Sequence, residues 1–96
     1  MIWKLIDTDE FNEDVQKLKK SGDKATLRKL EILLNELKID PYKGTGHPEP
    51  LKLDQSGKWS RKINKKHRLI YRPIADDKTP PKVVLLLAGY GHYDDK

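Results

Sequence analysis

The stretch Val83-Val84-Leu85-Leu86-Leu87-Ala88 is continuously apolar and ends at Gly89. Such a run is expected of a central strand that is covered on both faces of a sheet. Upstream of it, residues 59–63 alternate as a strand does, residues 67–72 are predicted to form the next strand, and residues 51–53 a shorter one. The carboxyl-terminal half of the chain therefore predicts a meander of about four strands.

The strand predicted at residues 59–63 has two different faces. Trp59, Arg61 and Ile63 should face one way, and Ser60 and Lys62 the other, because side chains alternate along a strand. An arginine on the face of a tryptophan and an isoleucine needs a partner or a ligand.

The amino-terminal half of the chain has the pattern of a strand followed by two helices. Residues 2–6 read as a buried strand, and Asp7 or Thr8 can cap a helix that ends near Gly22. A second helix is predicted from about 23 to 38, with an apolar core stripe of Leu27, Leu30, Leu34 and Leu37. The sequence thus predicts an α+β fold, β-α-α-β-β-β(-β), with a helical hairpin packed on a mostly antiparallel sheet.

Composition narrows the class of protein. The 96 residues suffice for one domain, residues 1–96, and the net charge of +5 favours a polyanionic partner. The absence of cysteine excludes disulfides, a thiolate nucleophile and a cysteine-based zinc site. The amino terminus has no signal-peptide or membrane-span pattern, so we expect a cytoplasmic protein.

Glu49 is the candidate general base, because Pro48 and Pro50 on either side restrict the backbone that carries it. The competing interpretation is a surface glutamate that pairs with a lysine.

Besides a general base, metal-free RNA cleavage would need cations to stabilise the charge that develops on the phosphorus centre. The candidates are Arg61 and Arg68, helped by Lys52, Lys62, Lys65 and Lys66. For the lysines, a solvated cationic face is the competing interpretation.

His92 is the candidate general acid, and Tyr93 could stack on a base or hydrogen-bond a phosphate. The competing interpretation is a frayed chain end. His47 and His67 are weaker candidates, since the three histidines have no metal-ligand spacing. We predict no metal and no cofactor.

Four blocks carry a resemblance to a known family. They are Gly44-Thr45-Gly46-His47-Pro48-Glu49-Pro50-Leu51-Lys52, Ser56-Gly57-Lys58-Trp59-Ser60-Arg61-Lys62-Ile63, His67-Arg68-Leu69-Ile70-Tyr71 and His92-Tyr93. In this order and spacing the chain resembles the YoeB (Txe) branch of the RelE/ParE toxin superfamily. Lys62, Thr45 and His47 stand where many relatives have other basic residues, which predicts a thinner cationic surface.

The resemblance implies a RelE-like small ribonuclease fold and a ribosome-dependent mRNA endonuclease of a toxin-antitoxin module. It implies Glu49 as general base, His92 as general acid, Arg68 as phosphate stabiliser and Tyr93 as an orienting group. It also implies a cognate antitoxin of the YefM/Axe type with an acidic segment over the basic cleft, operator DNA bound only by the toxin-antitoxin complex, and room for a homodimer.

Two other functions stay open from the sequence. One is a ParE-like toxin that inhibits DNA gyrase through protein contacts and needs no Glu49, Arg68 and His92 together. The other is a non-catalytic ribosome- or RNA-binding module, which would bind in a salt-sensitive way and leave RNA intact.

Overall fold

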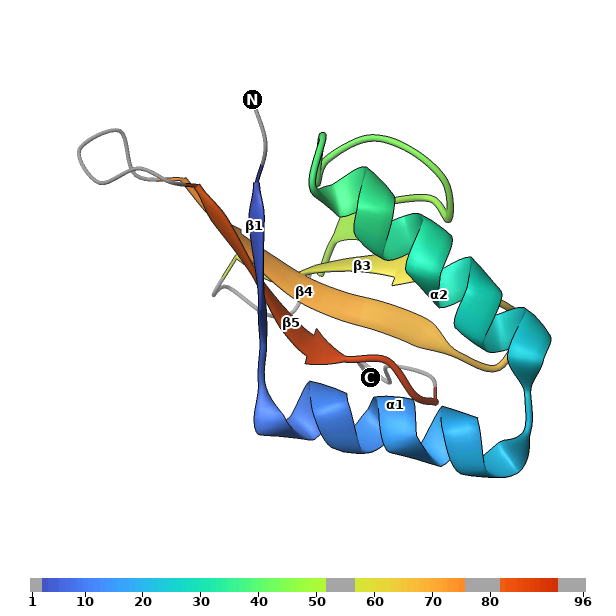
Figure 1. Cartoon of the computed structure of the whole chain (residues 1–96). Coiled ribbons are helices and arrows are strands. Elements are labelled where there is room, and N and C mark those ends of the chain that lie inside the picture. The colour runs from blue at the N-terminus through green and yellow to red at the C-terminus, as the bar shows by residue number, and fades with distance from the viewer. Residues whose placement is uncertain (1–2, 52–56, 76–81, 92–96) are drawn as a thin grey trace.

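The computed structural model describes residues 3–51, 57–75 and 82–91 (Figure 1). The elements follow in the order β1 (Lys4–Asp7), α1 (Asp9–Ser21), α2 (Lys24–Leu37), β2 (Glu49–Pro50), β3 (Trp59–Lys62), β4 (Arg68–Ile74) and β5 (Val83–Ala88). This arrangement confirms the predicted α+β class. Of the short strand predicted at residues 51–53, only Leu51 is described, and it follows the Glu49–Pro50 pairing without being part of a strand; residues 52 and 53 lie outside the described ranges.

The sheet has the strand order β1-β5-β4-β3-β2. β1 runs parallel to β5, and the other neighbours pair antiparallel, as predicted for a mostly antiparallel sheet. β5 is an inner strand, yet only Val84 and Leu86 are buried, while Val83, Leu85 and Leu87 remain partly exposed. The prediction that both faces of this strand are covered is wrong, because both helices pack on one face.

The β4 strand is longer than the sequence predicts and continues through Pro73 to Ile74. β3 pairs with β4 only as far as the Trp59–Tyr71 pair, so the end of β4 has β5 as its ladder partner. Proline is tolerated where one side of a strand makes no ladder hydrogen bond.

Side-chain caps fix where the helices begin. The Thr8 hydroxyl accepts the Phe11 N–H at 3.2 Å and donates to the Leu86 carbonyl at 2.7 Å, so the cap of α1 is also tied to β5. Asp23 caps α2 by accepting the Thr26 N–H at 3.1 Å, and the Thr26 hydrogen bonds lower the pKa of this carboxyl. Both positions agree with the predicted helix starts.

One core joins the two helices to the sheet. Its buried members are Trp3, Phe11, Leu18, Leu30, Leu33, Leu37, Ile63, Leu69, Tyr71, Val84 and Leu86. Of the predicted leucine stripe, Leu30 and Leu37 are fully in the core, whereas Leu27 and Leu34 pack against it half-buried. The chain that leaves β5 returns alongside α1 (Figure 1), where the Gly89 N–H donates to Asp14 at 3.0 Å.

Candidate active site

The register of β2, β3 and β4 brings the predicted base and the predicted phosphate ligand to one face of the sheet. Glu49 pairs with Ser60, and Lys62 pairs with Arg68. Directly paired residues project from the same face, and Ser60 and Lys62 share a face because they are two positions apart. We call this the open face, since it is turned away from α1 and α2. The prediction that Ser60 and Lys62 face opposite to Trp59, Arg61 and Ile63 is confirmed by burial and contacts of Arg61 and Ile63 on the helix side.

Arg68 lies at the centre of the open-face cluster. Its Nη1 is 3.7 Å from Glu49 Oε1 and 3.4 Å from Ser60 Oγ, to which it donates. The side chains of Arg68 and Glu49 are 29% and 60% exposed. An ion pair this open to water is weak and easily separated by an incoming anion. The pair therefore presents a carboxylate that can accept a proton beside a guanidinium that can bind two phosphoryl oxygens.

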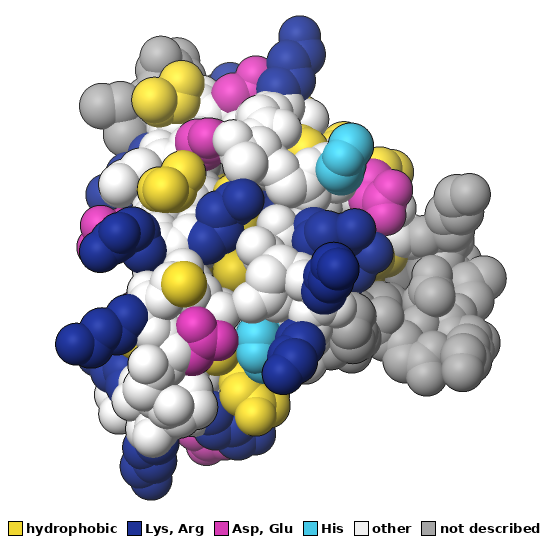
Figure 2. Space-filling view, turned by 90° about the vertical axis from the view of Figure 1, so that its right-hand side faces the viewer, with side chains coloured by type: hydrophobic (Ala, Val, Ile, Leu, Met, Phe, Trp, Pro, Cys, Tyr) yellow, Lys and Arg dark blue, Asp and Glu magenta, His cyan; other side chains and the backbone are white. Residues whose placement is uncertain are grey.

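Further exposed cations lie on β3 and β4 and in the turn between them. Lys62 is exposed on the open face, and Lys65 and Lys66 are exposed in the turn that joins β3 to β4. Arg72 is also exposed and lies four residues after Arg68 on the same strand. Arg72 was not among the predicted site residues, although alternation along the strand places it on the same face as Arg68. On one side of the molecule, Figure 2 shows lysine and arginine side chains interspersed with acidic and histidine side chains, so the basic surface there is interrupted.

Arg61 has a different position from the one predicted. Its side chain is 0% exposed, and its guanidinium donates to oxygen atoms of the chain itself. The acceptors are Tyr71 Oη (3.2 Å), Glu36 Oε1 (2.8 Å) and the carbonyls of Thr45 (3.4 Å), Asp40 (2.8 Å) and Lys43 (2.8 Å). These bonds use all five N–H groups of a guanidinium. The prediction that Arg61 holds RNA is therefore corrected: this residue anchors the 40–46 loop from the helix side.

Glu36 completes the anchor of this loop. Its carboxylate accepts the Thr45 N–H and hydroxyl, both at 2.7 Å, as well as the Arg61 bond. Burial alone would raise the pKa of Glu36, but the Thr45 hydrogen bonds and the Arg61 charge outweigh it, and the pKa lies below its usual value. The Lys62 N–H donates to the Gly46 carbonyl at 2.6 Å, so the chain reaches Glu49 along a fixed path.

The other predicted site residues lie outside the described ranges: Lys52, His92 and Tyr93. The residue before His92 is described, and both of its backbone groups are bonded. The Gly91 N–H donates to His67 Nδ1 at 2.8 Å, and the Gly91 carbonyl accepts the Arg68 N–H at 3.0 Å. The chain therefore reaches position 92 from a point bonded to the same residue, Arg68, whose side chain pairs with Glu49.

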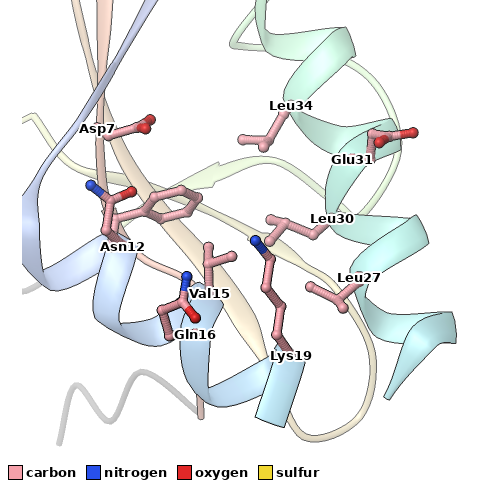
Figure 3. Close-up of a pocket in the computed structure, with 10 residues that line it drawn as sticks. Asp7, Asn12, Val15, Gln16, Lys19, Leu27, Leu30, Glu31 and Leu34 are labelled. Atoms are coloured by element: carbon pink, nitrogen blue, oxygen red, sulfur yellow. The ribbon is translucent and has the colours of Figure 1, made fainter. Parts of the chain in front are cut away.

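A separate pocket of about 500 Å³ lies between the helices (Figure 3). Leu27, Leu30 and Leu34 of α2 point into it, facing α1. None of the predicted site residues lines it.

Among the described residues, no cluster of three histidine, cysteine, aspartate or glutamate side chains could hold a metal ion. Within these same ranges, no helix has the length and apolar character needed to cross a bilayer.

Comparison with known proteins gives the family. The model of YoeB-like toxins of bacterial type II toxin-antitoxin systems matches residues 8–93. The chain is 47% identical over 72 residues to Toxin YoeB of Synechocystis sp., covering 75% of this chain and 77% of that protein. It is 39% identical over 71 residues to Toxin YoeB of Escherichia coli K12, covering 74% and 77%.

Solved structures agree. A YoeB/ParE toxin from Agrobacterium tumefaciens has a TM-score of 0.82 at 31% identity, covering 94% of this chain and 99% of that chain. A YoeB dimer from Staphylococcus aureus has a TM-score of 0.78 at 28% identity (97% and 100%), and a heterotetrameric YoeB-YefM toxin-antitoxin complex from the same organism has 0.73 at 28% (97% and 100%). This chain therefore belongs to the family of YoeB-like toxins of bacterial type II toxin-antitoxin systems.

Proposed function

We propose that this toxin is a metal-independent, ribosome-dependent mRNA endonuclease that acts in the ribosomal A site. The observation that carries the proposal is the open-face cluster, in which the Glu49 carboxylate lies 3.7 Å from the Arg68 guanidinium and both remain accessible. A general base and a phosphate ligand must reach the same phosphodiester, and these two are adjacent.

The proposed reaction is an internal transfer within the RNA. Glu49 takes the proton of a 2′-hydroxyl, and the 2′-oxygen forms a bond to the neighbouring phosphorus. Arg68 stabilises the negative charge on the non-bridging oxygens. The bond from phosphorus to the 5′-oxygen breaks, and His92 gives that oxygen a proton. The products are a 2′,3′-cyclic phosphate and a 5′-hydroxyl, and Tyr93 orients the substrate.

Cations around the cluster would hold the rest of the RNA. Lys62, Lys65, Lys66 and the newly located Arg72 are exposed around the open face, and Lys52 completes the predicted set. Arg61 is left out, because its N–H groups are occupied inside the fold. The binding would weaken steeply with salt, as expected where lysine and arginine neutralise phosphates.

We further propose that a YefM/Axe-like antitoxin neutralises the toxin by placing an acidic segment over this cationic face. Opposite charge favours such a complex, and a disordered acidic segment can order itself on binding. The Staphylococcus aureus structures of a YoeB-YefM complex and a YoeB dimer support an antitoxin complex and a homodimer here by similarity. The toxin-antitoxin complex, and not the toxin alone, would bind operator DNA.

The test is in vitro translation of a defined mRNA, with cut sites mapped by primer extension. The variants are Glu49→Gln and, as a matched control, Glu10→Gln, which changes an exposed glutamate in the first turn of α1. Loss of a general base should reduce cleavage about 10²–10⁴-fold. Wild type and Glu10→Gln should give the same translation-dependent cuts.

Other outcomes would remove the proposal. Translation that stops while the mRNA stays intact would favour a non-catalytic ribosome-binding module. Unaffected translation would lead to assays of DNA gyrase inhibition. If Glu49→Gln and wild type cut the mRNA equally, the protein would be a nuclease whose general base is a residue other than Glu49.

A further inference from the structure

Each residue of the segment Gly89–Gly91 contacts the rest of the fold. The Gly89 N–H donates to Asp14 of α1 at 3.0 Å. The Tyr90 ring lies with its centroid 4.7 Å from that of His67 and 5.4 Å from the Lys17 ammonium. Gly91 is bonded through both of its backbone groups, as described above. These contacts indicate that the fold holds the chain in one position up to residue 91.

His67 is the side chain on which this path depends. It is 8% exposed, and Nδ1 accepts the Gly91 N–H at 2.8 Å. A backbone N–H can only donate, so Nδ1 is the acceptor of this bond, and the bond needs an acceptor atom at this position of the side chain.

The His67 backbone is itself held in place. Asn64 Oδ1 accepts the His67 N–H at 2.8 Å, and Asn64 Nδ2 donates to the Thr26 hydroxyl at 2.7 Å. That hydroxyl donates in turn to Asp23, the cap of α2, at 2.6 Å. A continuous set of hydrogen bonds therefore runs from the start of α2 through His67 to Gly91.

We infer that His67 is a positioning residue: by holding Gly91, whose carbonyl accepts the Arg68 N–H, it fixes the point from which the chain continues to His92. The inference rests on the proposed function, in which His92 protonates the leaving oxygen. The His67 side chain accepts the Gly91 N–H, and the backbone N–H of the next residue, Arg68, donates to the Gly91 carbonyl. Two consecutive residues of the sheet therefore hold both backbone groups of Gly91. The α-carbon of the next residue is only about 3.8 Å further along the chain. A displacement of about 1 Å at a catalytic group can cost about 10²-fold in rate.

Two substitutions of the same shape separate the hydrogen bond from the packing. His67→Asn and His67→Leu both lose the ring, but asparagine keeps an acceptor near the position of Nδ1 and leucine has none. Each variant, with wild type and His92→Gln, is assayed by single-turnover cleavage on ribosomes programmed with mRNA. At the bond that wild type cuts, the mRNA carries either the ordinary phosphodiester or a 5′-bridging sulfur, whose thiolate departs without a proton.

The expected result has two parts. On the ordinary mRNA, His67→Leu should be slowed about 10–10²-fold and His67→Asn much less, because only leucine releases Gly91. On the sulfur mRNA, His67→Leu and His92→Gln should both recover to near the wild-type rate. Thermal unfolding of the two His67 variants checks that both are folded under the assay conditions.

Three results would overturn the inference. One is a wild-type rate for His67→Leu on the ordinary mRNA. Another is equal slowing of both His67 variants, which would indicate that the ring matters and the acceptor does not. The third is slowing of His67→Leu on both mRNAs, which would place the defect outside leaving-group protonation. If wild type cuts neither mRNA, the proposed function itself fails, and this result is distinct from the other three.

Discussion

Replacing Arg61 with methionine should lower the free energy of unfolding by about 2–7 kcal/mol, most of it the cost of leaving two buried backbone carbonyls without their donor. Methionine fills much of the same volume, so the change tests the hydrogen bonds more than the packing. The guanidinium is wholly buried, and its five N–H groups all have acceptors.

The magnitude can be worked from the acceptors. Glu36 is 32% exposed and keeps its Thr45 bonds, so it can rehydrate and should contribute at most about 1 kcal/mol. Tyr71 keeps its 2.7 Å bond to the Pro41 carbonyl. The carbonyls of Asp40 and Lys43, each 2.8 Å from Nη2, would face an apolar side chain, at about 1–3 kcal/mol each.

Urea unfolding followed by circular dichroism measures the loss. Arg72→Met is the matched control, because Arg72 is an exposed arginine on the neighbouring strand, and it should change stability by less than about 0.5 kcal/mol. If Arg61→Met and Arg72→Met unfolded at the same urea concentration, the loop anchor would have no energetic role and the reasoning would be refuted.

Three further predictions concern caps, glycines and pH. Thr8→Ala removes the cap of α1 and should cost about 1–2 kcal/mol in urea unfolding, most of which Thr8→Ser should restore. Gly22→Ala and Gly46→Ala both force alanine to a positive φ, at about 1–2 kcal/mol, but only at Gly46 would a Cβ lie 2.6 Å from a carbonyl oxygen. Gly46→Ala should therefore melt at the lower temperature, and equal melting temperatures would contradict this. Because the folded pKa of Glu36 is lowered, its stabilisation is complete above the unfolded pKa of about 4.3 and is lost as the pH falls through the folded value. Glu36→Gln should flatten the decline of stability in acid, and parallel profiles for variant and wild type would refute this.

Local patterns predicted most of the fold, because helix caps and strand alternation act over a few residues. Thr8 and Asp23 mark the helix starts in the sequence and cap them in the structure. Alternation also placed Arg61 on the side of Trp59 and Ile63. It could not name the partner, since Glu36 lies 25 positions earlier and the remaining acceptors are backbone carbonyls, which have no sequence signature.

The site was predicted in part for a similar reason. Glu49 was found from the prolines around it and Arg68 from its residue type, but their proximity follows from the register of β2, β3 and β4. His67 gave no local signal, because its acceptor role involves a residue 24 positions away. The sequence pattern therefore could not predict the contacts between residues that only the tertiary fold brings together.

The pairing of β1 with β5 has a consequence for the order in which the fold can assemble. Lys4 pairs with Val83, across almost the whole chain, whereas Lys62 pairs with Arg68 across a tight turn. Closing the longer loop costs about 2 kcal/mol more in chain entropy. The hairpin that carries Ser60 and Arg68 can therefore form early from local contacts, while the β1 edge is joined late. Destabilising β1 should speed unfolding more than it slows folding.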